Sequence, residues 1–381
     1  MGWPRIGMAP WGMLGALVAI GLIEVIIAHH DLDLTTADNM DWRTIRRAAV
    51  KKAPGCEILC LGTSMVQEGV LPRVIEQRAG KKTYNLAVCG GRVQLYYYYL
   101  KRALAAGARP STVLVDFHPF FIATDYTDGQ SWPDALGFWD CLDMSWNVRD
   151  PNFFASTVLA RSVPSIYHRH QLRAATLAAL RGESWTNRHR CLTYTRNINQ
   201  NQGSLIGHRN PDYRGEISET YQGMFLPKEW RCHPLAELYI HKFLDLAASH
   251  GIRVQWLVMP LTPGLQAGRE AKGLDESYIR AARAFQNAHP NLFVIDARHS
   301  GYDNSVFLDA CHIDFQGAFA LTKGIIDVLD RHEARPADTP RWVALPQYEE
   351  SPIESSLIED ISQSYQVIAT FGLREAGVVR R

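Results

Sequence analysis

The sequence predicts an α/β protein of three layers, in which helices cover both faces of a central parallel sheet of five strands. Short apolar runs rich in β-branched residues alternate along the chain with longer stretches that have helical spacing. The apolar runs are nearly continuous, with few polar residues among them. Strands of that kind are buried on both faces, which is typical of a parallel sheet between two layers of helices.

The elements follow one another in a regular order. Runs bounded by turn residues predict strands at residues 57–61, 83–88, 112–117, 253–259 and 292–296. Helical spacing between them predicts helices at residues 72–79, 93–106, 234–250, 274–288 and 315–331, three of which are followed by a glycine (Gly80, Gly107, Gly251). In an open sheet of this kind, binding and catalysis gather where the strands end.

The third and fourth predicted strands are separated by residues 118–232, far more than the usual connection, so this segment is predicted to be an insertion with its own structure. It holds half of the ten tryptophans: Trp132, Trp139, Trp146, Trp185 and Trp230. One interpretation is a helical cap whose tryptophans form a small core of their own. The other is a lid over the substrate cleft, with aromatic faces for sugar rings.

The N-terminal segment is predicted to anchor the chain in a membrane. Residues 8–28 are apolar apart from Glu24, and about 20 such residues are what a helix needs to cross a bilayer. Glu24 lies near one end of the stretch, where its carboxylate can reach the interface or be protonated. A cleaved signal peptide is the alternative, but residues 25–28 lack the small-x-small pattern of a cleavage site.

The chain is therefore divided into a membrane anchor and linker (1–54), a main domain (55–333) and a peripheral tail (334–381).

Charges near the predicted span do not decide its orientation. Arg5 precedes the span while Arg43 and two further arginines follow it, which favours a cytoplasmic domain. Long domains cross membranes largely regardless of such charges, however.

Composition excludes several function classes. The chain has 40 basic and 39 acidic residues, a net charge of +1, so it lacks the positive charge that binding to a nucleic acid backbone requires. Its seven cysteines include no CxxC pair and no zinc-like spacing, so neither a disulfide framework nor a metal site is predicted. No cofactor is predicted, and the sequence does not indicate the oligomeric state.

A candidate nucleophile follows the first predicted strand. That strand runs directly into Gly62, Thr63 and Ser64, and the next helix is predicted to begin only at Pro72, a residue favoured at a first helical position. Ser64 would thus lie at the carboxyl end of a central strand, beside backbone N–H groups that can stabilise an oxyanion. The alternative is that Thr63 or Ser64 only caps a turn or helix.

A candidate base and its partner lie near the other end of the chain. Asp309 and His312 form a D-x-x-H loop between the last predicted strand and the last helix. A serine hydroxyl needs an imidazole to take its proton, and the imidazole needs a carboxylate to fix its tautomer. Two other carboxylates have local interpretations, Asp116 as a hydrogen-bonding residue at a strand end and Asp314 as a helix-start residue.

Taken in order, these motifs resemble the SGNH (GDSL-like) hydrolase superfamily, in its membrane-anchored acyltransferase and esterase-like branch. The resemblance covers about residues 55–118 and 234–331 and implies a flavodoxin-like sheet with a triad of Ser64, His312 and Asp309. Thr63 stands where the family usually has an aspartate, as in membrane-anchored relatives that carry a small hydroxyl residue there.

The resemblance also implies an oxyanion hole. Its donors would be the N–H of Ser64 and that of Gly90 or Gly91, which follow the second predicted strand. The family places an asparagine after the third strand, but residues 115–119 read Val-Asp-Phe-His-Pro. His118 could replace it as an N–H donor, or an asparagine from the insertion could reach the site; a purely structural His118 is the other interpretation.

These features lead to three functional hypotheses. The first is hydrolysis or transfer of an O-acyl group, with an acetylated carbohydrate or cell-envelope glycan as the expected substrate. This expectation comes from the resemblance, because membrane-anchored relatives often act on such polymers, and it implies an extracytoplasmic domain. The second is a membrane-anchored binding or scaffold protein on a degenerate hydrolase fold, since the third-strand asparagine is missing. The third is a lipase-like esterase, which would need an apolar acyl tunnel under the insertion.

Overall fold

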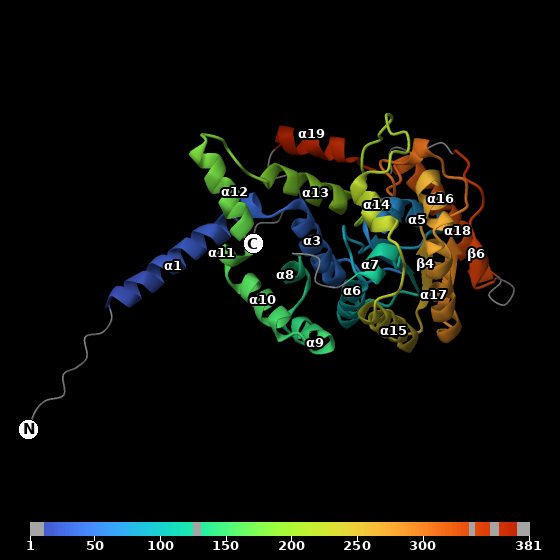
Figure 1. Ribbon diagram of the computed structural model, residues 1–381, viewed down its shortest axis with the longest axis horizontal. Helices are drawn as coiled ribbons and strands as arrows, with labels where there is room; N and C mark the ends of the chain where they lie inside the picture. The colour runs from blue at the N-terminus through green and yellow to red at the C-terminus, as the bar shows by residue number, and fades with distance from the viewer. Residues whose placement is uncertain (1–10, 125–130, 335–339, 351–357, 372–381) are drawn as a thin grey trace, which may run out of the picture.

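The computed structural model describes residues 11–124, 131–334, 340–350 and 358–371. Its centre is a parallel sheet of six strands in the order β2-β1-β3-β4-β5-β6 (Figure 1). The first five have the flavodoxin-like order. In this order, successive strands are added on one side of β1 and then on the other, so the direction of strand addition reverses between β1 and β3. The strands are β1 (Ile58–Leu61), β2 (Thr83–Asn85), β3 (Thr112–Val115), β4 (Arg253–Val258), β5 (Leu292–Asp296) and β6 (Trp342–Ala344).

The prediction of a five-stranded sheet was therefore one strand short. β6 lies in the segment assigned to the tail and pairs with β5, Val294 opposite Trp342. It has only three residues, partly exposed at the edge of the sheet, so it has no buried apolar run by which a sequence pattern could find it. The α/β class with a parallel sheet is confirmed.

Alternate residues of each strand enter two separate cores. In β1, Leu59 and Leu61 join the core under α3, α6, α15 and α17, whereas Ile58 and Cys60 join the core under α4, α5, α16 and α18. The helices that contribute to these cores are α3 (Ala37–Lys51), α4 (Ser64–Gly69), α5 (Pro72–Ala79), α6 (Val93–Ala105), α15 (Pro234–Ser249), α16 (Pro263–Ala271), α17 (Leu274–Ala288) and α18 (Phe315–Ala334). The sheet is thus buried on both faces, as its apolar strands require.

The N-terminal helix α1 (Trp11–His29) projects from the body (Figure 1). Its window Gly12–His29 has a mean hydropathy of 2.1 and is almost entirely exposed, so it is long and apolar enough to cross a membrane. A signal sequence has the same properties. After α2 (Asp31–Leu34), α3 packs into the sheet core with Trp42, Ile45 and Ala49, so this part of the predicted linker belongs to the folded body.

The insertion is helical. Its elements are α7 (Pro119–Ala123), α8 (Trp132–Ala135), α9 (Phe138–Val148), α10 (Pro151–Ser162), α11 (Pro164–Tyr167), α12 (Arg169–Leu180), α13 (Arg188–Gln200) and α14 (Glu219–Phe225). Trp132 and Trp230 are buried in the main core, whereas Trp139 and Trp146 on α9 are 75% and 84% exposed. A tryptophan core within the insertion, as one interpretation held, does not form.

The tail is attached to the insertion. Helix α19 (Ile361–Phe371) packs along α13, and Arg196 of α13 forms an ion pair with Glu359, Nε to Oε1 at 2.7 Å. The side chain of Asn197 donates to the carbonyl of Glu359 at 2.7 Å. Because Asn197 is fully buried, these contacts fix the described part of the tail to the body.

Candidate active site

Ser64 lies where β1 ends and α4 begins. Helix α4 starts at Ser64 itself, with the Thr63 hydroxyl accepting from the N–H of Met65 at 3.2 Å, so the prediction that no helix begins before Pro72 was wrong. The cap that was offered as the alternative to catalysis is therefore present, but it is made by Thr63. The Ser64 side chain remains partly exposed.

The turn before Ser64 is held by a carboxylate from the neighbouring strand. Asp116, at the end of β3, accepts from the Thr63 N–H at 2.8 Å and from the Thr63 hydroxyl at 2.6 Å. Gly62 has a φ of 153°, and a Cβ there would lie 2.0 Å from Oδ1 of Asp116, so only glycine fits. Burial raises the pKa of Asp116 to about 7 against the lowering effect of the two Thr63 hydrogen bonds. The interpretation of Asp116 as a hydrogen-bonding residue at a strand end is confirmed.

The D-x-x-H loop faces this turn. His312 Nε2 lies 2.7 Å from Ser64 Oγ, and His312 Nδ1 lies 2.8 Å from Asp309 Oδ2. The loop closes on itself, because the Leu308 N–H donates to the His312 carbonyl at 2.7 Å. The Asp309 carboxylate also accepts from the N–H groups of Cys311 and His312, at 3.0 and 2.9 Å. The structure thus brings together the three residues that the sequence singled out, in the order that serine activation requires.

The two ionisable groups of this loop stabilise each other's charge. Burial acts to raise the pKa of Asp309, but hydrogen bonds from His312, Cys311 and Tyr221 outweigh it, so the pKa lies well below its usual range. Burial acts to lower the pKa of His312, but the charge of Glu68 and the hydrogen bond to Asp309 hold it well above its usual range. The His312 side chain is still 18% exposed, so the imidazole is open to solvent.

Two residues that the sequence analysis missed act on this pair, Glu68 through its charge and Tyr221 through a hydrogen bond. Glu68 lies four residues after Ser64 on α4, which puts both side chains on one face of the helix. Tyr221, on α14 of the insertion, donates its hydroxyl to Asp309 Oδ2 at 2.7 Å. The spacing of Glu68 from Ser64 was a usable signal, whereas nothing local relates Tyr221 to a residue 88 positions later.

The structure distinguishes the two candidate glycines. Gly91 N–H donates to the Val88 carbonyl at 3.0 Å and closes a tight turn in which Gly90 has a φ of 65°. The Gly91 amide is therefore already engaged, while that of Gly90 is left for an oxyanion. The turn lies against the nucleophile segment, because Val88 N–H donates to the Gly62 carbonyl at 3.1 Å.

His118 follows β3 and is buried. Its Nδ1 accepts from the N–H of Phe120 at 3.2 Å and so caps α7. An accepting Nδ1 carries no proton, so the neutral ring has its proton on Nε2 and can donate there. Burial lowers the pKa of His118 to about 3, with further contributions from the positive charges of Arg269 and His312, so the ring is neutral near pH 7. Both interpretations of His118 are compatible with this geometry: it is a structural cap and an N–H donor.

One group of side chains could be taken for a metal site. Ligand atoms of Asp309, Cys311 and His312 lie within 4.8 Å of one another in the described part of the chain, a grouping that the sequence spacing did not suggest. His312 Nδ1 and the Asp309 carboxylate are bonded to each other, however, and burial raises the pKa of the Cys311 thiol, which favours its neutral form. The donor set fits a metal poorly, since a thiol binds metals as the thiolate.

A narrow pocket of about 20 Å³ adjoins the nucleophile turn, at the carboxyl ends of β3 and β4. Its walls are mainly apolar and include Met65, Phe225 and Leu257. At one side lies the guanidinium of Arg269, which is 2% exposed and whose Nη2 has no hydrogen-bond partner. A small ligand with an acceptor oxygen fits such a site, because apolar walls with few polar groups are what small-molecule pockets offer.

Comparison with known proteins identifies no family. No protein-family model matches the chain, and no curated protein matches it in sequence. Among the solved structures that match is one from Streptococcus pneumonia described as a candidate platelet activating factor. It has 12% sequence identity and a TM-score of 0.36, and the match covers 82% of this chain and 99% of that one. This likeness carries no argument about activity.

Proposed function

We propose that this chain is a membrane-anchored serine esterase or O-acyltransferase of the SGNH type, acting on an acyl ester of a carbohydrate or cell-envelope glycan, with acetyl as the acyl group. The observation that carries the proposal is the contact of 2.7 Å between Ser64 Oγ and His312 Nε2, with Asp309 on the other ring nitrogen. The motifs at Ser64 and at Asp309 and His312 support the SGNH type.

The reaction follows from these contacts. His312 Nε2 takes the proton of Ser64 Oγ as the oxygen attacks the ester carbonyl carbon, and Asp309 stabilises the imidazolium that forms. The carbonyl oxygen becomes an oxyanion, for which the N–H groups of Ser64 and Gly90 and the Nε2–H of His118 are the proposed donors. The ester C–O bond then breaks, and the leaving alcohol takes the proton from His312.

The second half of the reaction releases the acyl group. Water or a sugar hydroxyl attacks the acyl-Ser64 carbonyl while His312 takes its proton, and that proton returns to Ser64 Oγ as the bond to serine breaks. Water as acceptor gives an esterase, and a sugar hydroxyl gives a transferase. The pocket beside Met65 is proposed to hold the acyl group. Its volume of about 20 Å³ leaves room for little more than the methyl group of an acetyl, and not for the long chain of a lipase substrate.

Labelling with a fluorophosphonate probe tests the proposal. The probe reacts with an activated serine, so we expect the full chain to be labelled and the Ser64→Ala and His312→Asn variants to be unlabelled. Ser305→Ala is a matched control, because Ser305 lies just before the D-x-x-H loop and its hydroxyl donates to Asp303, outside the proposed triad. Absent labelling of the native chain, or labelling that survives Ser64→Ala, would favour the binding or scaffold protein instead.

A further inference from the structure

A cleft lined by basic residues opens at the inner end of α1. Its walls contain six cationic side chains, Arg43, Arg46, Arg47, Lys51, Arg102 and Arg161, and two carboxylates, Asp31 and Asp134. We call it the basic cleft. It lies between α3 and the helices of the insertion, and Ala28, in the last turn of α1, forms part of its wall.

The wall of the basic cleft has more cations than carboxylates among its described residues, although Arg102 also pairs with Asp140 outside the wall, Nη2 to Oδ2 at 2.5 Å. Arg43 uses both carboxylates, with Nε 2.9 Å from Asp134 and a second ion pair to Asp31. Arg46 makes no hydrogen bond or ion pair with any described residue. Burial, together with the neighbouring charges of Arg102 and Arg161, lowers the pKa of Arg46 to about 10. Like charges held together in a cleft attract an anion.

The position of the cleft relative to α1 indicates where that anion comes from. Glu24 accepts from the N–H of Ser165 at 2.9 Å and also from the Ser165 hydroxyl, which fixes α11 against α1. Glu24 is five residues before His29, about 7.5 Å along the helix at 1.5 Å per residue. If His29 marks the end of the membrane span, the cleft wall at Ala28 lies at the depth of the lipid headgroups, and the contact of α11 with Glu24 lies about 7.5 Å deeper.

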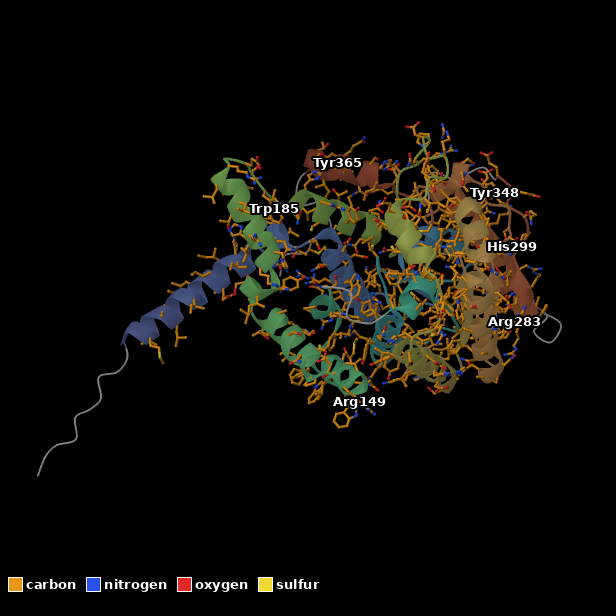
Figure 2. The ribbon with its side chains drawn as sticks, viewed as in Figure 1. Arg149, Trp185, Arg283, His299, Tyr348 and Tyr365 are labelled. Atoms are coloured by element: carbon orange, nitrogen blue, oxygen red, sulfur yellow. The ribbon has the colours of Figure 1, made fainter. Side chains whose placement is uncertain are left out.

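The insertion presents an aromatic face at the same side of the molecule. Helices α9 to α12 form the side from which α1 leaves, and Figure 2 shows Arg149 at the outer end of α9. Along α9, Phe138, Trp139, Leu142 and Trp146 are all exposed, and their spacing puts them on one stripe of the helix. Exposed tryptophans with a cation at the helix end are typical of a helix that lies in the interface of a bilayer.

We propose that the basic cleft binds the headgroup phosphate of an anionic phospholipid, in the leaflet that α9 contacts with its aromatic face. The cations pair with the phosphate oxygens, Arg46 and Lys51 first, while the acyl chains remain in the bilayer. This inference rests on the proposed membrane attachment through α1 but is independent of the reaction at Ser64.

Thermal unfolding of the full chain in dodecyl maltoside tests the lipid site. We expect dioctanoyl phosphatidylglycerol to raise Tm by about 2 °C, and dioctanoyl phosphatidylcholine and glycerol 3-phosphate to leave it unchanged. The double variant Arg46→Gln/Lys51→Gln should lose the increase, and Lys323→Gln, an exposed lysine on the opposite helical layer, should keep it. An equal effect of phosphatidylcholine, an equal effect of glycerol 3-phosphate, or an increase that survives the double variant would each overturn the proposal.

A second measurement tests the aromatic face. In nanodiscs made with brominated phosphatidylcholine, lipid bromines quench nearby tryptophans, and Trp139→Leu/Trp146→Leu should reduce the quenched fraction. Quenching that is unchanged by the double variant would contradict the contact of α9 with the bilayer. Both measurements use chains whose Ser64 labelling is scored separately, and extraction by alkaline carbonate reports on α1. Failure of the lipid site is therefore distinguishable from failure of catalysis or of anchoring.

Discussion

Thr63 donates both its backbone N–H and its hydroxyl to the buried carboxylate of Asp116, 53 residues later in the chain. The two hydrogen bonds join the end of β1 to the end of β3, the point at which the strand order reverses. Ser64 follows directly, so its position depends on this contact. An acidic residue therefore does lie against the nucleophile turn, although Thr63 stands where the resembled family has aspartate.

The buried carboxylate predicts how stability depends on pH. The pKa of Asp116 is about 7 in the folded chain against 3.8 when exposed, so folding favours the protonated form. Its contribution to the free energy of unfolding is full below pH about 4 and is lost as pH rises to about 7, on the order of a few kcal/mol. We expect Asp116→Asn to flatten the fall in stability between pH 4 and 7, measured by urea unfolding.

Asp41 is the internal comparison for that experiment. Asp41 is buried, its pKa is also raised to about 7, and it accepts hydrogen bonds from Cys89 N–H and Gln67. Part of the fall in stability between pH 4 and 7 should therefore remain in the Asp116→Asn variant. Asp212→Asn changes an exposed carboxylate and serves as the control. Its stability should fall between pH 4 and 7 as much as that of the native chain. A slope identical in Asp116→Asn and in the native chain would contradict the assignment.

The two glycines after β2 should differ sharply on substitution. A Cβ at Gly91 would lie 2.4 Å from the Gly62 carbonyl oxygen, in the segment that leads to Ser64, so Gly91→Ala must displace the turn or that segment. At Gly90 a Cβ meets open space, and only the positive φ is strained, at a cost of about 1 kcal/mol. We expect Gly90→Ala to remain folded and labelled and Gly91→Ala to lose at least tenfold in labelling rate. Equal rates would show that the close approach is not needed.

How far the sequence could predict the site depends on how local each part is. Ser64, Asp309 and His312 were found because each lies in a short motif next to a predicted strand or helix. The contribution of Tyr221 could not be predicted, because it depends on how the insertion folds back over the D-x-x-H loop. Whether His118 can act as an N–H donor could not be decided from the sequence for a different reason. The tautomer of its ring is set by the hydrogen bond from the Phe120 N–H, which only the three-dimensional structure reveals.

The same distinction applies to the fold. The five predicted strands and five predicted helices lie within a few residues of observed elements, because their apolar periodicity is strong, whereas α4, α16 and β6 were missed. Helix α3 was assigned to a linker because its sequence is polar, with arginines and aspartates around Trp42 and Ile45. Those two side chains are nevertheless buried, and Arg43 between them pairs with Asp134 of the insertion.

In the proposed mechanism, Glu68 should set the pH at which activity appears. His312 must be neutral to accept the Ser64 proton, so activity rises with pH through the raised pKa of His312. Removing the negative charge of Glu68 destabilises the imidazolium and lowers that pKa. We expect Glu68→Gln to move the rising limb of kcat/KM for p-nitrophenyl acetate to lower pH, by about 0.5 to 1 pH unit.

A control separates this effect from a general loss of surface charge. Glu219→Gln removes one carboxylate from an exposed position on α14 and should leave the profile unchanged. A rising limb that stays in place in Glu68→Gln, or that moves equally in both variants, would show that Glu68 does not act on His312.

One pair of substitutions can separate the proposed oxyanion role of His118 from its role as a helix cap. Asparagine keeps an acceptor for the Phe120 N–H and an N–H donor, so His118→Asn should stay within about tenfold of the native kcat. Leucine removes both, and loss of one oxyanion donor lowers kcat by about 10² to 10³. His233 is a matched control, because its Nδ1 caps α15 through the Leu235 N–H at 3.2 Å, so His233→Leu loses an equivalent cap. Since the pKa of His118 is about 3, the loss in His118→Leu should be the same from pH 6 to 9. A loss of kcat no larger than that of His233→Leu would leave His118 with the structural role alone.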